Sequence, residues 1–192
     1  MASVDDILSF WFGQPSEPGY TQPRGRWFEQ DSSFDAECAR RFLATHEKAA
    51  AGELQAWRDE PRGALALVLL LDQFPRNLFR DSARAFATDA QAREVARHAL
   101  ARGLDVPLPP VWRWFFYLPF EHSEEIHDQR LAVSLFEALV PQHPTGAGVL
   151  DYARRHHDII ARFGRFPHRN TWLGRESTPE EVAFLQEPGS SF

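Results

Sequence analysis

The sequence predicts an all-α fold. Glycine, proline and capping residues divide the 192-residue chain into about seven segments with helical apolar periodicity. Hydrophobic residues recur in these segments at i, i+3, i+4 and i+7, and no stretch shows the sustained alternation of a strand. Long helices joined by short loops form antiparallel hairpins, either as a bundle or as a stacked α-solenoid.

The first two predicted helices have recognisable ends. Ser3 and Asp6 match a capping box for a helix that stops at Gly13. A Pro- and Gly-rich connection covers residues 14–30, and the next helix begins near Asp31 and continues to residue 52. We expect the aromatic residues on both sides of this connection, Trp11, Phe12, Trp27 and Phe28, to belong to the core, with the last two alternatively pinning the connection.

The third predicted helix begins at Pro61 and is apolar on every side from Ala64 to Leu71. We therefore expect it to be the central buried helix. The later helices follow from capping residues, glycines and prolines, and one of them is a short aromatic segment that stops at Leu118-Pro119. The expected ranges are 88–103, 110–118, 123–139, 149–163 and a last short helix at 178–181.

Length and composition predict one domain over residues 1–192, because 43% hydrophobic and 25% charged residues are typical of a globular chain. The longest apolar run, 64–71, is far shorter than the roughly 20 residues that a membrane helix needs. The chain starts without a basic and apolar leader, so we expect a cytoplasmic protein. We interpret the single cysteine, Cys38, as a buried structural thiol.

The charge distribution bears on the class of partner. A net charge of −6 argues against non-specific nucleic-acid binding, which depends on Lys and Arg at phosphates. Residues 151–176, however, contain six arginines and three acidic residues. A local site for an anion is therefore compatible with the acidic chain.

Three segments share one pattern, in which an apolar helix is followed by a proline and a polar cluster. If successive helices alternate in direction, the third, fifth and seventh helices are parallel, and the three polar clusters lie at one end of the domain. This inference requires residues 76–80 to form a turn and not a further helix. The three segments are 71–77, 117–124 and 162–170.

A structural role for these polar residues is the first alternative. The last carbonyls of a helix are unpaired and carry partial negative charge, so Arg76, Asn77, Arg165 and His168 can act as caps. Asp72 is harder to explain in this way, because a carboxylate at the end of an apolar helix is costly to bury unless it is paired.

Metal and cofactor signatures are absent from the sequence. His156-His157-Asp158 suggests a metal or acid-base site, but adjacent helix residues point about 100° apart. Arg154, Asp158 and Arg162 more simply form a surface charge ladder. A single Glu-x-x-His step at Glu124 lacks its second copy, and no dinucleotide, phosphate-loop or nucleophile-elbow motif occurs. We therefore expect no metal and no cofactor.

The combination of several motifs resembles the bacterial family known as domain of unknown function 924, over nearly the whole chain. The resemblance implies an all-helical, tetratricopeptide-like right-handed superhelix and no established activity. The motifs are Asp6-Ile7-Leu8-Ser9-Phe10-Trp11-Phe12, Leu71-Asp72-Gln73-Phe74-Pro75-Arg76-Asn77, Ala85-Phe86-Ala87-Thr88-Asp89, Tyr117-Leu118-Pro119-Phe120-Glu121-His122-Ser123-Glu124 and Arg162-Phe163-Gly164-Arg165-Phe166-Pro167-His168-Arg169-Asn170.

Three functions remain open. The first is a binding module whose polar groove holds a peptide terminus or a small anionic ligand, because arginine forks suit carboxylate and phosphate. The second is a hydrolase-type enzyme with a Glu/Asp–His acid-base pair and arginines that stabilise negative charge. The third is a structural or protein-interaction scaffold. The candidate ligand-binding residues are Asp72, Gln73, Arg76, Asn77, Glu121, His122, His157, Arg162, Arg165, His168, Arg169 and Asn170.

Overall fold

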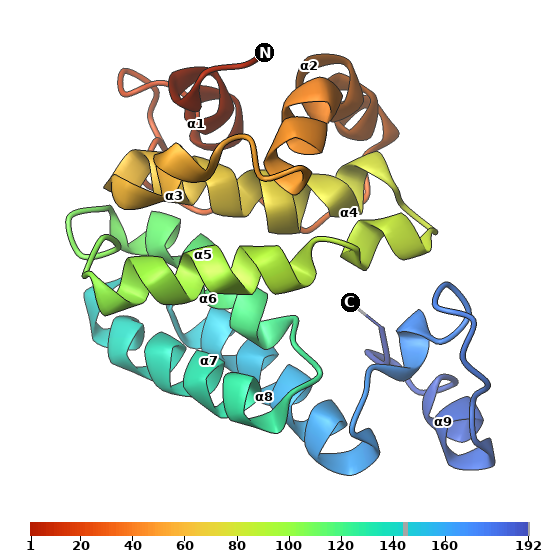
Figure 1. Cartoon of the computed structure of the whole chain (residues 1–192). Helices are drawn as coiled ribbons and strands as arrows, with labels where there is room; N and C mark the ends of the chain where they lie inside the picture. Colours follow the sequence, from red (N-terminus) through yellow and green to blue (C-terminus); the bar gives the residue numbers. More distant parts are fainter. Residues whose placement is uncertain (144–145, 192) are drawn as a thin grey trace.

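The computed structural model describes residues 1–143 and 146–191, and every regular element in them is helical (Figure 1). The all-α prediction is confirmed. Across these residues none of the helices combines the length and the apolar character needed to span a bilayer. The α-helices are α1 (Val4–Phe12), α2 (Ser32–Ala50), α3 (Pro61–Val68), α4 (Phe74–Leu78), α5 (Asp89–Ala101), α6 (Pro110–Glu121), α7 (Ile126–Leu139), α8 (Gly146–Phe163) and α9 (Pro179–Phe184).

The helices are stacked in layers. In Figure 1, α1 and α2 lie over the run formed by α3 and α4, and α5 lies on the other side of that run. Contacts then continue from α5 to α6, from α6 to α7 and from α7 to α8. The C-terminal segment, which contains α9, is set to one side beyond the end of α8. Neighbours in sequence are therefore mostly neighbours in space.

Aromatic side chains dominate the core, as expected. Trp112 stacks on Phe12 with ring centroids 4.2 Å apart, and the Trp27 indole N–H donates to the Trp11 carbonyl at 2.9 Å. Trp27 thus both fills the core and pins the connection between α1 and α2. The same expectation is wrong for Phe28, which is 61% exposed, because its ring points outward at the end of a 3-10 turn. Cys38 is buried, which raises the pKa of its thiol to about 12.

Two predicted helix ends are wrong. The third helix does not stop at Leu71, because a π-helical turn (Leu69–Gln73) joins α3 to α4 in one helical run that reaches Leu78. Residues 76–78 of the predicted turn at 76–80 are accordingly part of α4. Similarly, α6 passes through Pro119 and ends at Glu121. In both places buried residues such as Phe74 and Phe120 keep the helix in the core despite the proline.

The third segment does break as predicted. Gly164 follows α8 with φ of 68°, a left-handed conformation that glycine adopts without strain, and a 3-10 turn covers Pro167–Arg169. This turn belongs to a small second group of buried apolar residues, formed by Ile159, Ile160, Phe166 and Phe184. It carries Arg169 back toward α5 and α6.

Candidate functional site

The π-helical turn is the element that positions Asp72. In this turn the Phe74 N–H donates to the Leu69 carbonyl, five residues back, and Pro75 has no N–H to offer. The carbonyls left without a helical donor accept side-chain hydrogen bonds instead. His46 Nδ1 lies 2.8 Å from the Leu70 carbonyl, and Thr88 Oγ1 donates to the Leu71 carbonyl at 2.6 Å. Single π-helical turns inside α-helices are frequent at functional sites.

Asp72 is completely buried and is surrounded by donors. Its Oδ1 lies 2.8 Å from His122 Nδ1, and its Oδ2 accepts from Gln73 Nε2 at 2.6 Å. Arg76 Nη1 lies 3.4 Å from Oδ1 and also donates to the Asp72 carbonyl. Burial alone raises the pKa of Asp72, but the charges of Arg76 and His122 and these hydrogen bonds outweigh it and hold the pKa well below its usual range.

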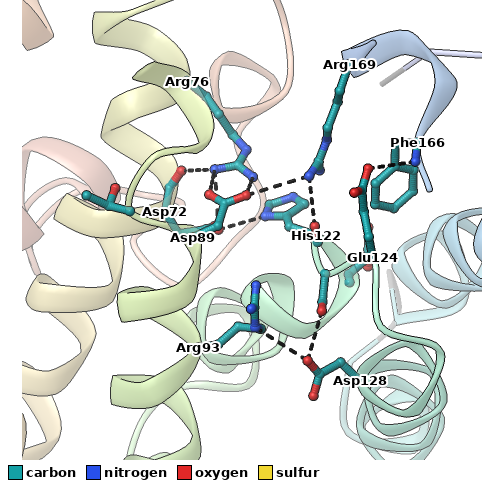
Figure 2. Close-up of polar contacts among 12 residues, drawn as sticks. Asp72, Arg76, Asp89, Arg93, His122, Glu124, Asp128, Phe166 and Arg169 are labelled. Carbon is teal, nitrogen blue, oxygen red and sulfur yellow. Dashed lines mark hydrogen bonds and ion pairs between the residues drawn. The ribbon is translucent and has the colours of Figure 1, made fainter. Parts of the chain in front are cut away.

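Asp89, at the start of α5, joins the first segment to the third. Its two carboxylate oxygens accept from Arg76 Nη1 at 3.0 Å and Nη2 at 3.1 Å, which is the bidentate arrangement (Figure 2). Arg169 Nη1 lies 3.7 Å from Asp89 and donates to the His122 carbonyl at 3.0 Å. The three polar segments therefore meet. We call these five residues, Asp72, Arg76, Asp89, His122 and Arg169, the Asp72 cluster.

The side chains of the cluster are buried to different extents. Its carboxylates are inside, since the side chains of Asp72 and Asp89 are 0% and 9% exposed. The side chains of Arg76 and His122 reach solvent, at 23% and 13%. Arg169 is nearly buried and lies between the rings of Phe86 and Phe166, 4.7 and 4.4 Å from their centroids. The groups of the cluster that reach solvent are therefore Arg76, which is positive, and His122, which can become positive.

His122 is held in one tautomer. An ionised Asp72 can only accept, so Nδ1 carries the hydrogen and a neutral ring presents the lone pair of Nε2. Within the described part of the chain Nε2 has no hydrogen-bond partner. Burial and then Arg76 lower the pKa of His122, and Asp72 opposes them. The result is a partly exposed proton acceptor whose opposite nitrogen is fixed by a buried carboxylate.

Three further titratable groups are buried near His122. Burial and then the charge of Asp72 raise the pKa of Glu121 to about 8. Burial lowers the pKa of His156 to about 3, and burial with Arg169 lowers the pKa of His168 to about 4. Such shifted values gather at functional sites more often than elsewhere, although structural networks also produce them.

Five of the candidate residues lie elsewhere, each with a partner of its own. The contacts are Asn77 with Asp35 at 2.8 Å, His157 with Asp158 at 3.1 Å, Arg162 with Glu180 at 3.0 Å, Arg165 with Glu181 at 2.6 Å and Asn170 with Ser177 at 3.0 Å.

The predicted ladder of Arg154, Asp158 and Arg162 is wrong. Arg154 pairs with Glu137 on α7, and Arg162 pairs with Glu180 on α9, because partners on neighbouring elements lie within reach of both arginines. In residues 1–143 and 146–191 no group of three His, Cys, Asp or Glu side chains is arranged to hold a metal ion.

Sequence reasoning missed three residues of the site. Asp89 was assigned only to a helix start, where acidic residues are common, and its partners are 13 residues or more away. Phe86 was not considered as a platform for arginine. Glu124 pairs with Arg175 at 2.7 Å and so holds the C-terminal segment against the turn after α6. The two residues are 51 positions apart, and no local pattern predicts their pairing.

Fold and site together define a helical protein with a buried ionisable cluster where three polar segments meet. Its relatives agree on the fold and give no activity. The sequence profile of the bacterial proteins of unknown function called DUF924 matches residues 7–189, and the chain belongs to this family. The solved structure of a protein of unknown function from Agrobacterium tumefaciens is 43% identical, with a TM-score of 0.83 over 95% of this chain and 96% of the other. No curated protein matches the chain significantly.

Proposed function

We propose that the Asp72 cluster binds a small anionic ligand at the edge formed by Arg76 and His122. The observation that carries this proposal is the depth of the charges. The carboxylates of Asp72 and Asp89 are buried, whereas the guanidinium of Arg76 and the imidazole of His122 reach solvent. An approaching anion therefore meets the Arg76 guanidinium and the His122 ring before it meets a carboxylate, and the acidic partners hold both side chains in place.

A second buried carboxylate, that of Asp128, also has exposed arginines on its solvent side, and this arrangement supports the proposal. Asp128 is buried and accepts from Ser123 Oγ at 2.9 Å. Arg97 lies 2.7 Å and Arg93 3.4 Å from its oxygens, with both arginines on the exposed side. Asp89, Arg93 and Arg97 are spaced at i, i+4 and i+8, so they share one face of α5. Excess positive charge along this face attracts anions toward the cluster.

The internal pairing of the arginines limits the kind of ligand. Arg76 already donates two hydrogen bonds to Asp89, and Arg169 holds the His122 carbonyl. Arg76 is therefore not available for a second bidentate contact, and the side chain of Arg169 is only 7% exposed. The proposal accordingly concerns a small anion that contacts the exposed edges of Arg76 and His122. Gln73, Glu121 and His168 take part as the surrounding polar groups.

Anion binding can be tested by thermal unfolding with acetate, succinate, phosphate and sulfate, because a ligand of the native state raises the midpoint temperature. We expect at least one anion to stabilise the wild-type protein. His122→Gln should abolish this stabilisation, whereas His157→Gln, on an exposed part of α8, should retain it. Stabilisation that is unchanged in H122Q, or absent for all four anions, would contradict the proposal.

A second candidate function is acid-base catalysis, and the 2.8 Å contact between Asp72 and His122 favours it. A carboxylate that orients an imidazole through Nδ1, with Nε2 open to a ligand, is the base-and-orienter arrangement of many hydrolases. Hydrolysis of p-nitrophenyl acetate tests this function. The wild-type rate should exceed the H122Q rate by about 100-fold, the lower end of what general bases contribute. Equal rates would reject it.

We also infer that residues 1–192 form one cytoplasmic domain built as a tetratricopeptide-like right-handed superhelix. The successive contacts of α5, α6, α7 and α8 support the superhelix, and the ion pair between Glu124 and Arg175 supports one domain. Denaturation followed by circular dichroism and by tryptophan fluorescence should then give coincident transitions. Two separate transitions would indicate two domains.

A further inference from the structure

The Asp72 cluster is electrically balanced before any ligand arrives. The carboxylates of Asp72 and Asp89 face the guanidiniums of Arg76 and Arg169, two charges of each sign. The imidazole of His122 adds none while it is neutral. A bound anion would therefore bring one uncompensated negative charge into a largely buried site, and such a charge is costly unless it is paired.

His122 can supply the missing positive charge without breaking a contact. Its Nδ1–H already donates to Asp72, and Nε2 is the atom without a partner among the described residues. A proton on Nε2 creates a new N–H on a ring that contacts the same oxygen of Asp72 as Arg76 does, and both side chains reach solvent. The imidazolium would remain paired with the buried carboxylate behind it.

Charged groups on several elements face His122. From the helical run through α4, Asp72 favours its protonation and Arg76 opposes it. From α5, Asp89 favours it more weakly. From the 3-10 turn after α8, Arg169 contributes positive charge beside the His122 carbonyl. In the free site burial and Arg76 outweigh the acidic groups and lower the pKa of His122, and the negative charge of an added anion would raise it.

The uncharged titratable neighbours complete the surroundings. Glu121, the preceding residue, is protonated at neutral pH because it is buried beside Asp72. From α8, the ring of His156 lies 6.3 Å from that of His122, and from the 3-10 turn His168 faces it as well. Burial keeps both imidazoles neutral, so neither competes with His122 for the proton.

We infer that this site takes up a monocarboxylate together with one proton, which is carried by His122 Nε2. The inference rests on the proposed anion-binding function and goes beyond it. One proton compensates one negative charge, so a dianion such as sulfate would leave the site negative. The two carboxylate oxygens match the two donors at the solvent edge, the Nε2–H of His122 and the guanidinium of Arg76.

Acetate and sulfate are the probes, with His122 observed by NMR of the imidazole nitrogens in protein labelled at histidine. In free protein at neutral pH we expect a neutral His122 that carries its hydrogen on Nδ1. In the acetate complex both nitrogens should be protonated. Because binding takes up a proton, the affinity for acetate should fall as pH rises, about tenfold per pH unit between the pKa of His122 in the free protein and its pKa in the complex. Calorimetry in buffers of different ionisation enthalpy should give about one proton per acetate.

Sulfate should bind at least tenfold more weakly than acetate at neutral pH, and H157Q should behave like the wild-type protein. If acetate binds at His122 while the imidazole stays neutral, the inference fails and the anion-binding function stands. If sulfate binds as tightly as acetate, the assigned ligand class is wrong. If neither probe perturbs His122 even at pH 5.5, the proposed function fails as well. These readings use wild-type protein and do not depend on whether a variant folds.

Discussion

Glu121 Oε1 and His156 Nδ1 lie 3.2 Å apart in the interior, and at neutral pH both groups are uncharged. The distance alone suggests an ion pair. Burial, however, raises the pKa of Glu121 to about 8 and lowers the pKa of His156 to about 3, and both shifts favour the neutral forms. The negative charge of Asp72 raises the pKa of Glu121 further, so of these two carboxyl groups Asp72 is the ionised one.

Glu121→Gln should therefore change how stability depends on pH. A folded pKa above the ordinary value of 4.5 means that the Glu121 contribution is complete below pH 4.5 and is lost as pH rises to about 8. E121Q stays neutral and should gain about 1.4 kcal/mol per pH unit relative to wild type across this window. Urea unfolding at pH 5, 6.5 and 8 measures it. Glu137→Gln, in an exposed pair, is the control, and parallel curves for E121Q and wild type would contradict the assignment.

His156→Asn should change how the stability of the protein depends on pH in the acidic range. A folded pKa of about 3 for His156, below the ordinary 6.5, gives a contribution that is complete above pH 6.5 and is lost as pH falls. Asparagine keeps a donor for the Tyr152 carbonyl, which lies 2.9 Å from Nδ1, but it does not titrate. Between pH 6 and 4 the variant should lose less stability than wild type, by about 1.4 kcal/mol per pH unit. Equal losses would mean that His156 is charged in the folded protein.

Asp72→Asn tests the Asp72–His122 dyad, in which the carboxylate orients the imidazole. The variant keeps an acceptor for His122 Nδ1 but removes the negative charge that favours the imidazolium, so the pKa of His122 should fall further below its usual range. The pKa of Glu121 should fall too, since Asp72 is one cause of its elevation. Histidine NMR titration measures the first change, and the signal of His98, which pairs with Asp59, serves as the internal control. An unchanged His122 titration would exclude the dyad.

Thr88→Val should leave the Leu71 carbonyl without a donor and cost about 1–3 kcal/mol, the usual penalty for a buried unsatisfied group. Pro75→Ala restores a backbone N–H that can bond to this carbonyl. T88V should therefore cost less in a P75A background, and a double-mutant cycle from urea unfolding gives the coupling. Thr45→Val, whose hydroxyl instead accepts from the Ala2 N–H, is the control and should not couple to P75A. Additive T88V and P75A effects would refute this account of the turn.

Glu124→Gln should loosen the C-terminal segment. Glu124 accepts from Arg175 at 2.7 Å and from the Phe166 N–H at 2.8 Å, and a charged acceptor strengthens both bonds. We expect faster hydrogen exchange at the Phe166 amide and over residues 164–191, with little change in α1 to α5. Glu180→Gln removes an exposed partner of Arg162 and should leave the exchange unchanged. Uniform acceleration across the chain would instead indicate global destabilisation.

Local signals predicted the helix boundaries well where the causes are local. The predicted capping box at Ser3 is present, because it involves residues three positions apart, and Thr178 starts α9 in the same way. The helix ends predicted from Pro75 and Pro119 are wrong, and at Pro75 the side chain of Thr88, distant in sequence, donates to the Leu71 carbonyl in place of the missing N–H. Such a compensating contact cannot be read from a single segment.

The candidate site was partly predictable for the same reason. Polar residues after apolar helices pointed to Asp72, His122 and Arg169, and these three do meet. Asp89, which connects two of the segments, was recognisable only once the pairing with Arg76 was seen in three dimensions. Opposite charges far apart in sequence have too many possible partners for spacing alone to select one.

The π-helical turn also restricts how this gene can change by insertion and deletion. A five-residue turn holds one residue more than the spacing of an α-helix allows, and each residue turns the helix by about 100°. Deleting one residue from Leu69–Gln73 would yield a regular helix that still buries its leucines. It would keep the helices on either side in phase but change the spacing of the side chains within the turn, so Asp72 would no longer be held against His122. Descendants that lost this residue could retain the fold without the site, so segment length distinguishes relatives that keep the chemistry from those that keep only the scaffold.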